Sequence, residues 1–276
     1  WIIRKHASML ADIGVDFIYL DVTNGEPFPN VYKTIFQEFK TLRDAGVDTP
    51  DICFFLSDSA EPNQKVFADI WDNIYATGQY SDLYAMYKGK PLILGNLSSF
   101  DEEITSQFTV RRCWALQSEL GDGKDYWNWM CETPQVASYN SQTGEIEEIS
   151  ISAGILVNLS IGRSYTAASG QPPLSRLPDG TLDYFQFQMP STAYGLLFAE
   201  QMKRAEEVDP YVLLVTGWNE WTAGRWETTA YGAKIANTYL TNSGEDWTKN
   251  YYVDAFNPEF SRDIEPMSGG FGDNYY

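Results

Sequence analysis

The chain has 276 residues, of which 43% are hydrophobic and 21% charged, a balance typical of a globular rather than a disordered protein. Its formal net charge of −19 would repel phosphate backbones, so we expect no nucleic acid partner and favour neutral or weakly charged ligands. An acidic surface that only aids solubility explains the total charge equally well. No apolar run reaches the roughly 20 residues of a membrane-spanning helix, so no membrane insertion is expected.

The side chains available for chemistry are restricted. The single histidine, His6, lies on the apolar face of a predicted helix, and its isolation argues against most metal sites and histidine-dependent nucleophiles. Three cysteines (Cys53, Cys113 and Cys131) form no Cys-x-x-Cys pair, and the first two lie in apolar stretches typical of a core. We therefore expect no metal and no cofactor, and acid–base chemistry that depends on carboxylates.

The first hundred residues repeat a unit of one helix followed by one buried strand. Apolar residues at helical spacing, ended by glycine, alternate with short continuous apolar runs. The joint Ala-Asp-Ile-Gly-Val-Asp at 11–16 recurs as Arg-Asp-Ala-Gly-Val-Asp at 43–48. The pattern predicts helices over residues 2–13, 31–42 and 66–75, and strands over residues 17–22, 52–56 and 91–95.

The rest of the chain is less regular. Apolar and β-branched runs predict strands over residues 110–116, 126–130, 146–157, 211–216 and 251–256. A helical pattern covers residues 194–208, and residues 162–183, rich in Gly, Ser and Pro, predict a long loop on the surface or over a site.

Strands that begin one strand-plus-helix unit apart are typical of parallel α/β folds. No Gly-x-Gly-x-x-Gly follows the first strand, which disfavours a dinucleotide-binding fold. The length suits one barrel of about 250 residues. The sequence therefore predicts an α/β fold, a (β/α)8 TIM-type barrel, as one catalytic domain over residues 1–276. Because the chain opens inside a helix, we expect its first strand upstream of Trp1, in a longer protein.

Polar side chains directly follow the predicted strands. In parallel barrels the active site lies at the C-terminal ends of the strands, so such residues would share one mouth. The carboxylates and amides in this position are Asp21, Asp58, Asn96, Glu132, Asn219, Glu220 and Asp254.

Two of these carboxylates are the catalytic candidates. Glycoside cleavage needs one carboxylic acid to protonate the leaving oxygen and a second carboxylate that attacks the sugar or activates water. Glu220 is the first choice, because tryptophans flank it and apolar walls raise a carboxyl pKa. Asp21 is the second. The structural alternatives are an ion pair of Glu220 with Arg225 or Arg163, and a turn cap by Asp21.

Other polar and aromatic residues are candidates for sugar binding. Rings with a polar edge stack on the C–H faces of sugars, although such rings also fill cores. A helix cap is the structural alternative for the aspartate at position 58. The expected substrate-binding residues are Asn219, Trp218, Trp221, Asn24, Asp58, Trp114, Arg163 and Asp254.

At Gly217-Trp218-Asn219-Glu220-Trp221 and Arg262-Asp263-Ile264-Glu265-Pro266 the chain resembles barrel proteins related to glycoside hydrolase families 71 and 99. Residues 252–274 resemble bacterial members that carry further carbohydrate-related domains. The resemblance implies a (β/α)8 barrel that cleaves glycosidic bonds, with Glu220 in the active site. In the endomannosidase family a second glutamate follows three residues after the first, and Ala223 stands there in this chain.

These observations predict a glycoside hydrolase that acts on a poly- or oligosaccharide, secreted or periplasmic in a bacterium, with appended carbohydrate-binding domains. A carbohydrate-binding barrel without catalysis is the first alternative, for which Ala223 is the main argument. A glycosyltransferase or polysaccharide-modifying enzyme is the second. The chain has no Asp-x-Asp metal motif or phosphate-binding loop, which disfavours it.

Overall fold

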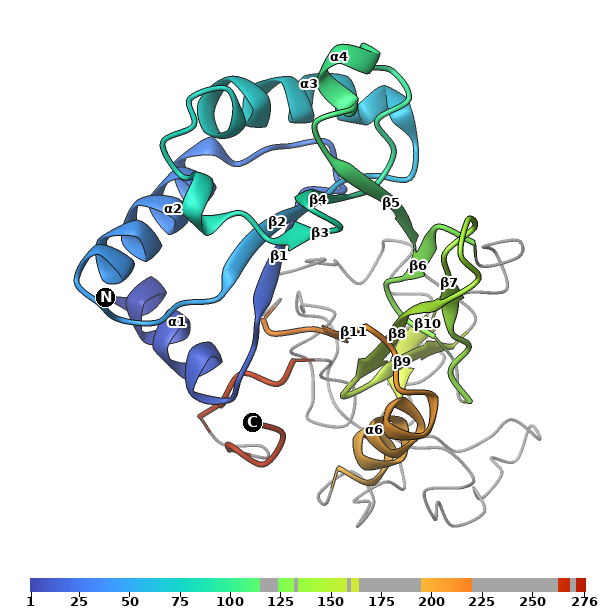
Figure 1. Cartoon of the computed structure of the whole chain (residues 1–276). Coiled ribbons are helices and arrows are strands. Elements are labelled where there is room, and N and C mark those ends of the chain that lie inside the picture. Colours follow the sequence, from blue (N-terminus) through green and yellow to red (C-terminus); the bar gives the residue numbers. More distant parts are fainter. Residues whose placement is uncertain (115–123, 132–133, 158–159, 164–194, 220–262, 269–271) are drawn as a thin grey trace, which may run out of the picture. The chain divides into compact units, whose positions relative to one another are not determined.

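The computed structural model describes residues 1–114, 124–131, 134–157, 160–163, 195–219, 263–268 and 272–276. The chain divides into two compact units, Trp1–Trp114 and Ala115–Tyr276, called unit 1 and unit 2 below. The described residues form an α/β protein in which most strand pairs are parallel (Figure 1). Within them no helix combines the length and the apolar character needed to cross a membrane.

Unit 1 alternates helices and strands, as the sequence predicts. Its helices are α1 (Ile2–Asp12), α2 (Pro29–Asp44), α3 (Ala60–Ile70), a π-helical turn (Trp71–Tyr75), a 3-10 turn (Ser81–Leu83) and α4 (Glu102–Thr105). Its strands are β1 (Phe17–Asp21), β2 (Asp51–Phe55), β3 (Met86–Tyr87), β4 (Lys90–Leu94) and β5 (Thr109–Trp114).

The sheet of unit 1 has the order β1-β2-β4-β5, and these four strands are parallel to their neighbours. Strand β3 pairs with β4 in the antiparallel direction. A parallel pair needs a long crossover connection, and here each crossover contains a helix. The predicted parallel arrangement of the first strands is confirmed.

Two helices of unit 1 end in the same way. Gly14 and Gly46 adopt positive φ angles of 78° and 77°, which glycine accepts without steric cost. The following N–H groups then bond back into the helix, from Val15 to the Leu10 oxygen and from Val47 to the Leu42 oxygen. The matching joints in the sequence are therefore matching helix caps, each of which turns the chain into a strand.

The core of unit 1 lies between the sheet and its helices. Helices α1, α2 and α3 lie along one side of the sheet (Figure 1), and β2 presents Ile52 and Phe54 to this core, followed by Leu56 just past its end. Phe36 of α2 stacks on Phe54 with ring centroids 5.9 Å apart. The alternate residues Cys53 and Phe55, on the other face, are buried as well. This two-sided burial explains why the strand reads as a continuous apolar run.

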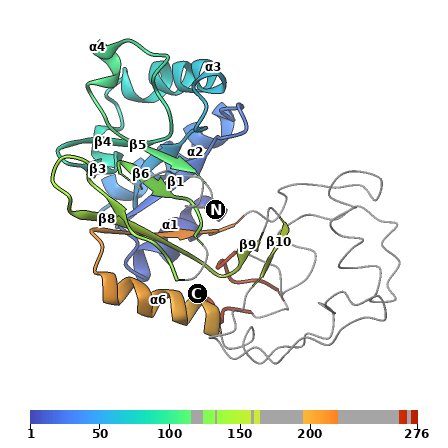
Figure 2. The same cartoon turned by 90° about the vertical axis from the view of Figure 1, so that its right-hand side faces the viewer.

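Unit 2 contains β6 (Tyr126–Asn128), β7 (Ser138–Tyr139), β8 (Ile146–Ser152), β9 (Ile155–Val157), β10 (Ser160–Arg163), α6 (Leu196–Val208) and β11 (Val212–Thr216). Strand β8 pairs in parallel with β11 and antiparallel with β7. Helix α6 runs beside β8 (Figure 2), where Ala205 packs with Ile149 and Ile151. Strands β9 and β10 form an antiparallel pair.

The strand region predicted over residues 146–157 is interrupted once in the structure. It is two strands, β8 and β9, separated by a bend at Ala153 and Gly154. The Ser152 hydroxyl donates a 2.7 Å hydrogen bond to the Gly154 carbonyl oxygen and so closes the bend. The predicted strand at 251–256 lies outside the described residues, as does the predicted loop beyond residue 163.

Candidate functional site

Polar side chains gather at the C-terminal ends of the parallel strands of unit 1. Asp21 ends β1, Asp58 follows β2, Asn96 follows β4, and Arg112 lies in the last part of β5. The backbone pairing continues past the strands, since the Asn96 N–H bonds to the Ser57 carbonyl oxygen at 3.1 Å. The strand ends of this unit therefore lie side by side, where the sequence analysis expected them.

The Asn63 side chain of α3 joins the ends of β2 and β4 through hydrogen bonds. Its side chain is fully buried, accepts the Ser57 N–H at 3.0 Å and donates to the carbonyl oxygens of Ser57 and Asn96, both at 2.7 Å. Asn96 in turn donates to the Asp58 carbonyl oxygen at 2.9 Å. The sequence analysis did not single out Asn63, although an amide among the apolar positions of a helix is a signal of such a role.

Asp58 forms a bidentate ion pair with Arg112. The Arg112 Nε and Nη2 atoms donate to the two carboxylate oxygens at 2.8 and 2.7 Å, the geometry that a planar guanidinium favours. Helix α3 begins after Ser59, with no side-chain cap bond. The helix-cap alternative for Asp58 is therefore wrong, because its carboxylate turns to β5 instead. A ligand that contacts Asp58 would therefore find a carboxylate whose negative charge is already compensated by the Arg112 guanidinium.

Asp21 lies in a turn and keeps access to solvent. Its Oδ1 accepts the Thr23 N–H at 2.9 Å, and Gly25, with φ 81°, completes the turn next to the exposed Asn24. The turn-cap alternative is thus present in the structure. Desolvation by surrounding protein raises the pKa of Asp21, while the bonds from Thr23 lower it. A carboxylate that is both exposed and partly desolvated can hold its proton nearer to neutral pH than usual.

The register of the sheet fixes the face on which Asp21 lies. Asp21 pairs with Phe55 across the β1–β2 ladder, so both side chains are on the same face. The helix-facing residues of β2 are the alternate ones, Ile52 and Phe54. Asp21 therefore belongs to the sheet face that α1, α2 and α3 leave uncovered.

In unit 2 the residues that follow β11 lie against residues 264 and 265. Past the end of β11, Gly217 and Trp218 accept backbone hydrogen bonds from Ile264 (2.8 Å) and Glu265 (3.0 Å). The Asn219 side-chain Nδ2 donates to Glu265 Oε2 at 2.9 Å. The half-buried Trp218 ring meets Tyr276 edge-on, with centroids 6.2 Å apart. Two segments far apart in the sequence are thus hydrogen-bonded to each other just past the C-terminal end of β11.

A buried carboxyl group that the sequence analysis missed lies on β8. Glu148 is fully buried, and its Oε2 accepts the Asn128 N–H at 3.0 Å and the Ser138 hydroxyl at 2.8 Å. Desolvation raises its pKa to about 8, although these two bonds oppose the rise. Its other oxygen has no hydrogen-bond partner within the described part of the chain. The signal in the sequence is the Glu147–Glu148 pair, since glutamate is depleted in strands.

Glu148 does not lie at the C-terminal ends of the strands, where the other candidate residues lie. It pairs with Val212 at the start of β11, four residues before the Ser152–Thr216 pair at the other end. At about 3.3 Å per residue, this is roughly 13 Å from the end of the strand. Glu148 is thus an interior group. The neighbouring Glu147 accepts hydrogen bonds from Trp127 at 3.0 Å and Asn140 at 2.8 Å.

Several predicted site residues fall outside what the structure describes. These are Glu220, Trp221 and Asp254, together with the strand-end residue Glu132 and the side chain of Arg163, which belongs to β10. Trp114 ends β5 and is 40% exposed. His6 is half-buried on α1.

None of the three cysteines forms a disulfide and all three are buried, which confirms the core interpretation of Cys53 and Cys113. Burial raises the pKa of the Cys53 thiol. Within the described ranges, no group of three or more His, Cys, Asp or Glu side chains is placed to hold a metal ion.

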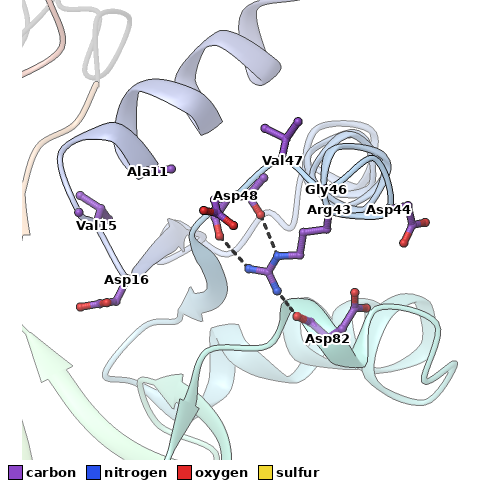
Figure 3. A pocket seen from close by; sticks show the side chains of 11 residues that line it. Ala11, Val15, Asp16, Arg43, Asp44, Gly46, Val47, Asp48 and Asp82 are labelled. Atoms are coloured by element: carbon purple, nitrogen blue, oxygen red, sulfur yellow. Dashed lines mark hydrogen bonds between the residues drawn. The ribbon is translucent and has the colours of Figure 1, made fainter.

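An open depression of about 640 Å³ lies at the N-terminal ends of the unit 1 strands, between the joints that precede β1 and β2 (Figure 3). Arg43 crosses it and donates to the carbonyl oxygens of Asp82 and Thr49 and to the Asp51 carboxylate. Ligand sites of parallel α/β folds lie at the C-terminal ends of the strands. We therefore assign Arg43 a structural role, in which its hydrogen bonds hold these connecting segments together.

Comparison with protein-family models finds no match to this chain, and the searches of curated proteins and of solved structures find none either.

Proposed function

We propose that the chain is a glycoside hydrolase built on a (β/α)8 barrel, with Glu220 and Asp21 as its catalytic carboxylates. The observation that carries the proposal is the hydrogen-bonded strand end formed by Gly217–Asn219 and Ile264–Glu265. These are the two segments in which the chain resembles the relatives of families 71 and 99. The further substrate-binding candidates are Trp218, Asn219, Trp221, Asn24, Asp58, Trp114, Arg163 and Asp254.

The arrangement of unit 1 supports a barrel over an open, doubly wound sheet. In doubly wound folds helices cover both faces of the sheet, whereas in a barrel they cover only the outer face. Helices α1, α2 and α3 lie on one face, and Asp21 lies on the other. On this proposal Asp21 faces the interior of the barrel at its C-terminal mouth.

The proposed reaction breaks the bond between the anomeric carbon and the bridging oxygen. One carboxylic acid gives its proton to the leaving oxygen, and the other carboxylate attacks the anomeric carbon or takes a proton from the attacking water. A raised pKa suits Asp21 to a proton-carrying role, because a general acid or base works best near the operating pH. Glu220 then supplies the second carboxylate.

The test is hydrolysis of a panel of soluble polysaccharides that differ in sugar and linkage, including xylan, mannan, arabinan, pectin and β-glucan. The wild-type chain should release reducing ends from at least one, and Glu220→Gln and Asp21→Asn should each lower the rate by at least about 10²-fold. Asp48→Asn, which lies at the N-terminal ends of the strands, is the matched control and should keep full activity.

A carbohydrate-binding barrel without catalysis is the second candidate. Ala223, which stands where one related family has a second glutamate, and the internally balanced Asp58–Arg112 pair both favour it. Calorimetric titration with the same panel separates the two functions. A polysaccharide that binds the wild type and both variants equally, with no cleavage of any member, would make the hydrolase proposal untenable.

A further inference from the structure

We propose that the Asn24–Gly25 peptide is a site of self-modification, at which the side-chain amide of Asn24 is converted into a carboxylate. An Asn-Gly pair occurs once in the chain, in the turn that follows β1. Asn24 is exposed, and its side chain forms no hydrogen bond within the part of the chain that the structure describes. The modification needs no ligand, so it does not depend on the proposed hydrolase activity.

The reaction uses only the chain and water. The Gly25 backbone nitrogen gives up its proton and bonds to Asn24 Cγ, the bond from Cγ to Nδ2 breaks, and the amide nitrogen leaves as ammonia with that proton. Water then opens the cyclic imide. Breaking the new bond to Cγ gives aspartate, and breaking the original peptide bond gives isoaspartate, in which the backbone continues through the side chain. One water enters and one ammonia leaves, with no change of oxidation state.

Gly25 offers an accessible nucleophile. Its φ of 81° is one that glycine adopts without steric cost, and it carries no side chain that could shield the nitrogen. A Cβ atom added there would meet only Pro62, at 3.8 Å, so there is room around this peptide. The Gly25 N–H is bonded to the Val22 carbonyl oxygen at 3.3 Å, beyond the usual range of about 2.7–3.2 Å, so this bond is weak and easily released.

Asn30 is a matched position that should not react. It is also exposed, but it lies in the first turn of α2 and is followed by the β-branched Val31. The Val31 N–H donates to the Phe28 carbonyl oxygen at 2.8 Å, which holds this nitrogen in the helix. The branched side chain also crowds the nitrogen and is stiff about its first torsion. The two asparagines therefore share their exposure and differ in the group that must attack.

The modification would add a negative charge to the turn that contains Asp21. Asp21 Oδ1 already accepts the Thr23 N–H in this turn. A second carboxylate there would disfavour the ionised form of Asp21, because like charges repel. It would also replace an amide, which donates and accepts hydrogen bonds, by a group that only accepts them. The effect on catalysis rests on the proposed function, whereas the modification itself does not.

The experiment ages the full chain in mildly alkaline buffer and follows each asparagine by peptide mass spectrometry. The peptide that contains Asn24 should gain the mass that distinguishes a carboxylate from an amide, in two forms that chromatography separates as aspartate and isoaspartate. Fragment ions that divide the peptide between Gly25 and Asn30 assign the change to one position. Asn30 should keep its amide over the same period. Circular dichroism verifies that the chain stays folded.

Two variants test the chemistry at this peptide. Asn24→Gln keeps the amide but lengthens the side chain, which disfavours closure of the ring, so position 24 should keep its mass. Gly25→Ala shields the nitrogen and should slow the conversion severalfold. Because alanine is strained at a positive φ, both variants are also followed in urea, where the effect of the sequence persists without the fold.

Either of two results would overturn the proposal. In the first, Asn24 keeps its amide in the folded chain for as long as the urea-unfolded chain needs to lose it, which would mean that the turn protects this peptide. In the second, Asn24 and Asn30 are converted at equal rates, which would mean that Gly25 gives no selectivity. Failure of the hydrolase proposal looks different, because the change in mass at Asn24 would persist while no polysaccharide is cleaved.

Discussion

At the scale of single residues, Glu148 has a direct consequence for stability. Its pKa rises from the usual 4.5 to about 8 in the folded chain, so the native state keeps a proton that the unfolded state has already lost. Between those two pH values the folded state binds more protons than the unfolded state. The contribution of Glu148 to stability therefore falls as pH rises through this window, and it is constant above it.

The corresponding prediction concerns Glu148→Gln. The neutral glutamine still accepts the hydrogen bonds from Asn128 and Ser138 but has no proton to lose. The stability of the variant should therefore not fall between pH 4.5 and 8 through titration at position 148. We expect it to have a higher Tm than the wild type at pH 8, by roughly 2–4 °C for each kcal/mol gained. Thermal unfolding at a series of pH values measures this. Parallel stability curves for the two proteins would show that Glu148 is already ionised when folded.

The residue scale also shows where sequence reasoning ends. The predicted strand-end positions of Asp21, Asp58 and Asn96 were right, because hydrophobic periodicity locates the end of a buried strand. The partners Arg112, Asn63 and Glu265 were not predicted, because each partnership joins distant segments of the chain. Periodicity carries no information on which distant residue a side chain meets.

At the scale of elements, Gly95 sets the approach of β4 to the end of β2. Its φ is +131°, and a Cβ atom there would lie 2.7 Å from the Leu56 Cβ and 2.8 Å from the Leu56 carbonyl oxygen. Any other residue would push apart the two strand ends that Asn63 joins. The sequence placed this glycine at the end of a predicted strand, but the contact that requires it is visible only in the fold.

Gly95→Ala should therefore lower the free energy of unfolding by about 1–3 kcal/mol through backbone strain, with a further cost from the clash with Leu56. Gly89→Ala is the matched control. Its φ is also positive, at 81°, but a Cβ atom there would meet nothing within 4 Å. Urea unfolding of both variants measures the difference. Equal losses would mean that the contact with Leu56 does not matter.

Predictions for elements succeeded where a pattern was long. The helices and strands of residues 1–100 follow their apolar spacing, and the joints at 11–16 and 43–48 are equivalent caps. The prediction for 146–157 missed one interruption, because strand-like residues continue on both sides of Ala153 and Gly154, where a local hydrogen bond bends the chain. Short-range bonds of this kind leave the apolar pattern unchanged.

At the scale of the whole molecule, the net charge of −19 should shape binding. A neutral glycan gains or loses little electrostatic energy in the field of such a protein, whereas a polyanion is repelled at low ionic strength. We therefore expect the affinity for a neutral polysaccharide to change less than about twofold between low and high NaCl. Calorimetry across a salt series measures this. Affinity that collapses with salt would point to a charged ligand instead.

The buried cysteines give the chain internal reporters of its own opening. Cys53 and Cys113 belong to unit 1 and Cys131 to unit 2, and none of the three forms a disulfide. A thiol reagent reaches a buried sulfur only when the surrounding structure opens, so the rate of labelling measures local unfolding free energy. Mass spectrometry of each labelled peptide would then show which of the two units opens first.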